Sequence, residues 1–146
     1  MLEIIPQKEA INSAVAIHSV RFLVLHGSYA TKTAHAESDV DVAVFFEPGA
    51  PALASMSAYG ELCQALTEAL GVGMRNLDVV ILNTANILLR YEVTSKGILL
   101  YGNCNAYDQY CAFAFRDYVD AKDLFQLEHE LIENRQRFLA QAMTAR

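Results

Sequence analysis

Two aspartates separated by a single valine, Asp39 and Asp41, open an apolar stretch that runs to residue 46. Residues two apart on a β-strand project from the same face, so both carboxylates would point into one site. Two like charges held together are costly unless they share a proton or a cation. Oxygen ligands of this kind suit Mg²⁺ or Mn²⁺. Asp78 lies near the start of a further apolar stretch and is a third candidate ligand, which would come from another strand.

The dipeptide Gly27-Ser28 follows the apolar run 21–26 and predicts the complementary half of such a site. We expect a strand to end at His26 and Ser28 to open a short helical turn. Glycine permits close backbone approach, and exposed N–H groups with a serine hydroxyl donate to phosphate oxygens. Two metal ions beside such a loop can orient an attacking oxygen and stabilise a displaced pyrophosphate. Each pattern alone is common in solvated turns, so the prediction rests on their combination along successive strands.

The composition narrows the class of protein. The 146 residues suffice for one domain with a proper core, and 53% hydrophobic with 19% charged residues is typical of a globular chain. A net charge of −6 disfavours direct nucleic-acid binding, although bound metal leaves a nucleotide substrate open. No signal sequence or membrane-length apolar run is evident, and the three cysteines form no CxxC pair, so we expect a soluble cytoplasmic protein.

Hydrophobic periodicity predicts an α/β (α+β) fold, with a small mixed β-sheet, flanking helices and a long C-terminal helix. We expect Val40, Val42, Val44 and Phe46 to share one face of their strand, opposite Asp39, Asp41, Ala43 and Phe45. Pro6 is expected to open a first helix that ends near residue 19. The remaining predicted elements are strands at 21–26, 39–46, 76–82 and 98–101 and helices at 53–70, at 84 or 86 to 96, and at 107–143.

The last of these helices carries an apolar stripe that recurs every seven residues, through Tyr118, Phe125, Ile132 and Leu139. Unbroken, it would be on the order of 50 Å long, longer than the small sheet beneath it. We therefore expect either that the helix breaks and folds back, or that a partner covers part of the stripe.

The stretch LHGSYATKTAHAESDVDVAVFF resembles the signature of the DNA polymerase β-like nucleotidyltransferase superfamily. At this size the chain is most similar to the minimal nucleotidyltransferases (MNT domain), the antitoxins of HEPN/MNT toxin–antitoxin pairs. The resemblance spans about residues 20–102. It implies a nucleotidyltransferase core over residues 1–103 and a helical extension of the same domain over residues 104–146.

The resemblance implies that Asp39 and Asp41 bind two Mg²⁺ ions, and that Asp78 is a metal ligand and the base for the acceptor hydroxyl. Gly27 and Ser28 would hold the triphosphate of ATP. The family transfers AMP, and its antitoxin members modify a tyrosine of a HEPN toxin, as in a type VII-like pair. The partner would then be a HEPN-domain toxin, in a hetero-oligomer formed through the C-terminal helix.

The chain departs from the common family pattern at two places in the loop. His26 replaces a frequent Phe, and Thr31-Lys32 replaces a frequent Arg-Gly, so that Lys32 is a candidate phosphate contact. Two other functions stay open. The acceptor could be a small hydroxylated molecule such as an aminoglycoside, or the protein could be a non-catalytic antitoxin that acts by binding. Arg90 and Lys96 could approach a nucleotide, but solvated helix-face charges explain them adequately.

Overall fold

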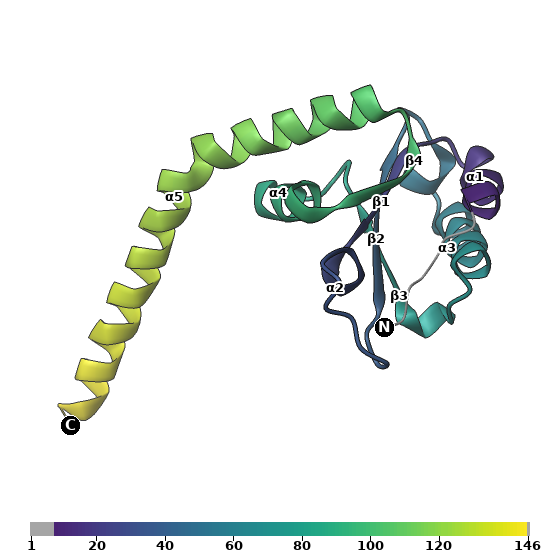
Figure 1. Cartoon of the computed structure of the whole chain (residues 1–146). Helices are drawn as coiled ribbons and strands as arrows, with labels where there is room; N and C mark the ends of the chain where they lie inside the picture. The colour runs from purple at the N-terminus through teal and green to yellow at the C-terminus, as the bar shows by residue number, and fades with distance from the viewer. Residues whose placement is uncertain (1–7, 146) are drawn as a thin grey trace.

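A computed structural model describes residues 8–145 of the chain. Its centre is a four-stranded sheet in the order β3-β2-β1-β4 (Figure 1). β1 is antiparallel to both of its neighbours, whereas β2 and β3 are parallel, so the sheet is mixed as predicted. The strands are β1 (Val20–His26), β2 (Val40–Phe46), β3 (Leu77–Ile81) and β4 (Ile98–Gly102).

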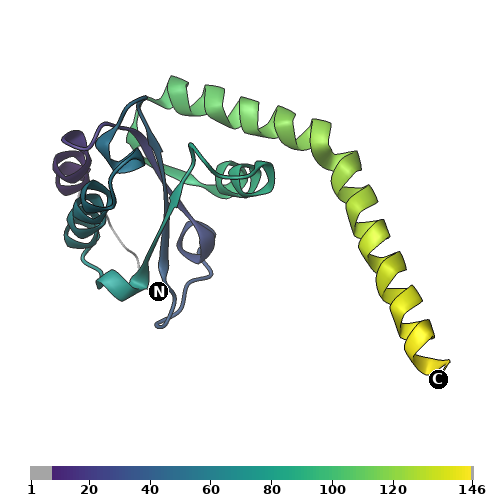
Figure 2. The same cartoon turned by 180° about the vertical axis from the view of Figure 1, so that it is seen from behind.

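Helices cover both faces of this sheet, as the two opposite views show (Figures 1 and 2). α1 (Lys8–Ala16) and α3 (Met56–Leu70) lie together on one side. α4 (Ile87–Lys96) and the first part of α5 (Cys104–Thr144) lie on the other, where the short α2 (Gly27–Ala30) follows the end of β1. Two 3-10 turns, η1 (Pro51–Leu53) and η2 (Met74–Asn76), complete the order of elements.

The alternation predicted for β2 is confirmed. One face of the strand packs into a core with α1 and α3, and it carries Val40, Val42, Val44 and Phe46. The other face contributes Ala43 and Phe45 to a second core, which includes Phe22 and Tyr110 and lies beneath α4 and α5. Asp41 has the parity of Ala43 and therefore lies on this second face.

Capping residues set several helix ends that differ from those expected. The Ser55 side chain accepts a hydrogen bond from the Ala58 N–H, so α3 begins after it and residues 51–53 form a separate turn. Asn86 caps α4, which decides between the two starts expected there. Asn103 caps α5, so this helix begins three residues before the predicted position. Pro6, expected to open the first helix, lies outside the described residues.

α5 continues without a break over 41 residues, a length of about 60 Å. Tyr107 and Ala114 are buried near its start, but the helix then leaves the sheet and projects away from it (Figures 1 and 2). Of the two outcomes expected for this helix, folding back is therefore wrong, and its distal apolar side chains stay uncovered. Within residues 8–145, no helix combines the length and the apolar character needed to cross a membrane.

Candidate functional site

Three polar side chains form a row across one end of the sheet. His26, the last residue of β1, is the register partner of Asp41 on β2, and Asp41 is the partner of Asp78 on β3. Register partners on adjacent strands share a face and lie side by side. The parallel pairing of β2 with β3 thus brings together two carboxylates that are 37 positions apart in the sequence. Asp39, immediately before β2, is exposed at the rim of this row.

The loop after β1 lies directly against the central carboxylate of the row. Gly27 has a φ of +68°, a left-handed conformation that L side chains rarely adopt. A β-carbon built on Gly27 would overlap an oxygen of the Asp41 carboxylate and lie 2.9 Å from its Cγ. Only glycine fits at this position. Because Gly27 has no side chain, the Asp41 carboxylate can contact the backbone of the predicted phosphate loop.

Two threonines fix the shape of this loop. The Thr31 hydroxyl donates to the Gly27 carbonyl at 3.1 Å, and the Thr33 N–H donates to the Ser28 carbonyl at 2.9 Å. The two threonine hydroxyls are 2.9 Å apart. Lys32 between them is exposed and has a φ of 59°. Lys32 therefore has a left-handed backbone at the position where the pattern of the resembled family implies glycine.

A cleft of about 790 Å³ separates the loop from α4. On the sheet side it is lined by His26, Asp41, Gly27, Ser28 and the two threonines, but not by Lys32, the predicted phosphate contact. On the opposite side α4 contributes five lining residues, namely Leu89, Tyr91, Glu92, Ser95 and Lys96. Of these five, only Lys96 was considered from the sequence as a possible nucleotide contact, and a solvated surface charge was an adequate explanation for it; the other four were not predicted. Lys96 provides the cationic side chain that the sequence analysis expected from Lys32.

Burial and mutual repulsion characterise the polar row. Burial raises the pKa of the Asp41 carboxyl; His26 opposes this effect, and the negative charges of Asp78 and Asp39 add to it. Burial also lowers the pKa of the His26 imidazole, against the attraction of the Asp41 carboxylate. The His26 Nε2 atom is buried without a hydrogen-bond partner within the protein. The row therefore combines a neutral imidazole with crowded carboxylates, an environment in which a bound cation would relieve the repulsion.

The donor chemistry of this row fits Mg²⁺ or Mn²⁺. Within residues 8–145, no three side chains of His, Cys, Asp or Glu stand close enough to enclose a metal ion by themselves. Magnesium seldom requires such a cage, because it is commonly held by one or two carboxylates together with water and the phosphates of a substrate. Asp41 and Asp78 side by side, with Asp39 at the rim, match that partial type of site.

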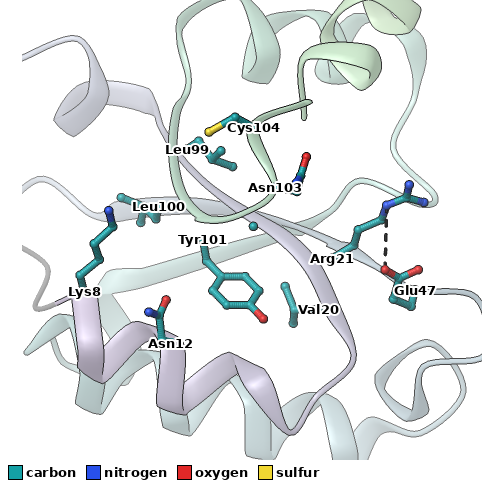
Figure 3. Close-up of a pocket in the computed structure, with 11 residues that line it drawn as sticks. Lys8, Asn12, Val20, Arg21, Glu47, Leu99, Leu100, Tyr101, Asn103 and Cys104 are labelled. Atoms are coloured by element: carbon teal, nitrogen blue, oxygen red, sulfur yellow. Dashed lines mark ion pairs between the residues drawn. The ribbon is translucent and has the colours of Figure 1, made fainter. Parts of the chain in front are cut away.

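A second hollow, of about 590 Å³, lies at the opposite end of β1 (Figure 3). Lys8 and Asn12 from α1, Tyr101 from β4 and the pair Arg21 and Glu47 line it. The Glu47 carboxylate is 3.9 Å from Arg21 Nε and so already has a cationic partner. The adjacent carboxylates and the glycine loop are both found at the other end of the sheet, and we therefore assign the candidate active site to the cleft beside α4.

Comparison with known proteins identifies the family to which this chain belongs. The sequence profile of the family described as "Polymerase beta, Nucleotidyltransferase" matches residues 8–105, about two thirds of the chain. The chain therefore belongs to the polymerase β-like nucleotidyltransferase family, as the resemblance of its loop and aspartates predicted. No curated protein matches it significantly.

Several solved structures are similar to this chain in fold. A toxin–antitoxin crystal structure with AMP-PNP matches with a TM-score of 0.70 and 23% identity, over 87% of this chain and 98% of that one. A tri-AMPylated Shewanella oneidensis HEPN toxin in complex with MNT antitoxin matches with a TM-score of 0.65 and 21% identity, over 86% and 95%. A chain described as a minimal nucleotidyltransferase is 30% identical, with a TM-score of 0.52, over 63% and 87%.

Proposed function

We propose that this protein is a Mg²⁺-dependent nucleotidyltransferase that transfers AMP from ATP to a tyrosine of a HEPN-domain partner, and that it acts as the antitoxin of that toxin. The observation that carries the proposal is the position of Asp41, which lies beside Asp78 on one side and against Gly27 of the phosphate loop on the other. A cation held there would contact both the carboxylates and the phosphates of a nucleotide.

The polar row and the cleft beside it both contribute groups to this proposal. Asp39, Asp41 and Asp78 would hold two Mg²⁺ ions, which neutralise charge on the triphosphate. The Gly27 and Ser28 backbone and the Ser28 hydroxyl would donate to phosphate oxygens, and Lys96 would add a positive charge from α4. Asp78 would accept the proton of the acceptor hydroxyl as its oxygen bonds to the α-phosphorus and pyrophosphate leaves.

The proposed partner rests on α5 and on the structural likenesses. The distal half of this helix exposes large apolar side chains, for example Leu131 at 60% and Phe138 at 69% of full exposure. A contiguous apolar surface of this kind on a soluble domain is typical of a protein–protein interface. Two structures of similar fold are toxin–antitoxin assemblies, one of them with an AMPylated HEPN toxin. We therefore propose that the exposed face of α5 binds the toxin and forms the hetero-oligomer.

The test combines this protein with the product of the adjacent gene, ATP and Mg²⁺. Mass spectrometry should find AMP on a tyrosine of the partner, and the double substitution Asp39→Asn with Asp41→Asn should abolish the modification. Toxin neutralisation in cells by that double variant, at wild-type strength, would instead show inhibition by contact alone. Labelling of an aminoglycoside or another small alcohol, with no labelling of the partner, would show that the acceptor is a small molecule.

A further inference from the structure

The wall that α4 contributes to the cleft changes in character along its length. β4 follows α4 directly, and its first residue, Ile98, is the register partner of Leu25 on β1. The end of α4 that carries Lys96 is therefore close to the loop at Gly27. Tyr91 precedes Lys96 by five residues, which corresponds to about 7.5 Å along the helix axis. Along this wall Lys96 is thus nearest to the phosphate loop and Tyr91 is farther from it, with the Glu92 carboxylate between them in the sequence.

The aromatic end of this wall is held in place by α5. The Tyr91 ring stacks face to face on Tyr118 of α5, with centroids 3.9 Å apart and an angle of 4° between the rings. On the preceding residue, Arg90 Nη1 lies 3.6 Å from the Asp117 carboxylate, in a second contact between the two helices. The Tyr91 ring is half-buried and lines the cleft while it makes this stack. Its position is therefore fixed before any ligand enters.

We propose that the base of the donor nucleotide packs against Tyr91 and Leu89, and that Tyr118 is the positioning residue that holds the Tyr91 ring in the cleft. This inference rests on the proposed function, because it assumes that the triphosphate lies at Gly27 and Lys96. The order of side chains along α4 indicates that Tyr91 and Leu89 contact the base of the nucleotide and not a side chain of the acceptor. A nucleotide bound by its phosphates at the loop extends its ribose and base away from it, toward Leu89 and Tyr91, and aromatic side chains suit the face of a base.

The experiment compares the binding of two probes, ATP and inorganic tripolyphosphate, each with Mg²⁺, by isothermal titration calorimetry. The Tyr91→Leu substitution should weaken ATP binding about tenfold, which is typical of the loss of one base–aromatic contact, and should leave tripolyphosphate binding unchanged. Tyr118→Leu should lower the ratio of the two affinities in the same direction but by less. Tyr118→Phe should restore the wild-type ratio, because the stack needs the ring and not the hydroxyl. Tyr101→Leu, in the second hollow, is the matched control and should leave the ratio unchanged.

The outcomes separate this inference from the proposed function. An unchanged ratio of the two affinities in Tyr91→Leu would overturn the base contact, whether both affinities stay at the wild-type value or both fall by the same factor. If that variant kept both affinities but transferred AMP to the partner more slowly, Tyr91 would contact the acceptor instead of the base. If the wild-type protein bound neither probe, the proposed function would fail, and this inference with it. Thermal unfolding of each variant identifies any that loses affinity through misfolding.

Discussion

The backbone of Gly27 and the carboxylate of Asp41 are in direct contact, because the position that a Gly27 side chain would fill is occupied by that carboxylate. This contact joins the end of β1 to the start of β2 at the point where their register pairing begins. It also brings the phosphate loop and the proposed metal ligand together. The two halves of the site therefore depend on a single glycine.

Replacement of this glycine should damage the site and the fold together. In Gly27→Ala the new methyl group would displace the Asp41 carboxylate, and the left-handed backbone would add about 1–2 kcal/mol of strain. Gly71→Ala is the matched control, since Gly71 has a φ of +67° with nothing within 4 Å of the added carbon. Urea unfolding should show both variants destabilised, with only Gly27→Ala losing ATP binding. Equal ATP binding in the two variants would contradict the contact described above.

Lys32 carries backbone strain of the same kind without a compensating contact in the cleft. Its φ of 59° is left-handed, and its side chain is exposed. Lys32→Gly should raise the free energy of unfolding by about 1 kcal/mol. The substitution removes the left-handed strain, and this gain is partly offset because glycine has greater conformational entropy in the unfolded chain. Lys32→Ala keeps the β-carbon and should give no such gain. ATP affinity should change little in either variant, whereas a large loss in Lys32→Ala would restore Lys32 as a phosphate contact.

Many of the strands and helices that position the site could be predicted from the sequence, because the residue patterns that indicate them are local. The alternation of Val40, Val42, Val44 and Phe46 defined the buried face of β2, and so assigned Asp41 to the opposite face. A glycine directly follows the predicted last residues of α3 and α4, and Asn86 is one of the two starts expected for α4. The helical turn expected at Ser28 is present as α2. Each of these features depends on neighbours within a few residues, which a single sequence contains.

The composition of the cleft wall was not predictable in the same way. Which strand lies beside β2 is a property of the whole sheet, so the pairing of Asp41 with Asp78 could only be a hypothesis before the topology was known. Lys96 and Tyr91 line the cleft because α4 packs across the sheet. Helical periodicity in the sequence does not show which part of the protein a helix face lies against. The exposure of Lys32 follows from hydrogen bonds of its two threonine neighbours, which residue type alone does not indicate.

The exposed face of α5 should be required for the partner and not for the fold. Leu131→Asp with Phe138→Asp places charges on side chains that are already mostly exposed, so the midpoint of thermal unfolding should stay near that of wild type. Partner affinity should fall by tenfold or more, as is typical of charges placed in an apolar interface. Calorimetry with the adjacent-gene product measures this loss, and Gln136→Asp on the same helix is the control. Undiminished affinity in the double variant would place the interface elsewhere.

The anchoring of α5 to the sheet should be sensitive to alkaline pH. Burial raises the pKa of Tyr110 to about 12, and its hydroxyl donates to the Leu82 carbonyl at 3.2 Å. The folded protein thus holds this proton more tightly than the unfolded chain, so stability should fall as the pH rises from about 10 toward 12. Tyr110→Phe should lower stability at neutral pH by about 1 kcal/mol and reduce the alkaline loss. Urea unfolding at about pH 8 and about pH 11 compares the two proteins; an unchanged difference in Tyr110→Phe would assign the loss to other groups.

The central claim is that Asp39, Asp41 and Asp78 support nucleotidyl transfer. It is tested most directly by ATP labelled either at the α-phosphate or at the γ-phosphate, incubated with Mg²⁺, this protein and its partner. The claim predicts that only the α-label enters the partner. It also predicts that Asp41→Asn and Asp78→Asn each reduce the rate by about a hundredfold or more, as is typical of the loss of a proton-transfer or charge-stabilising group. Transfer of the γ-label, or wild-type transfer of the α-label by Asp78→Asn, would contradict it.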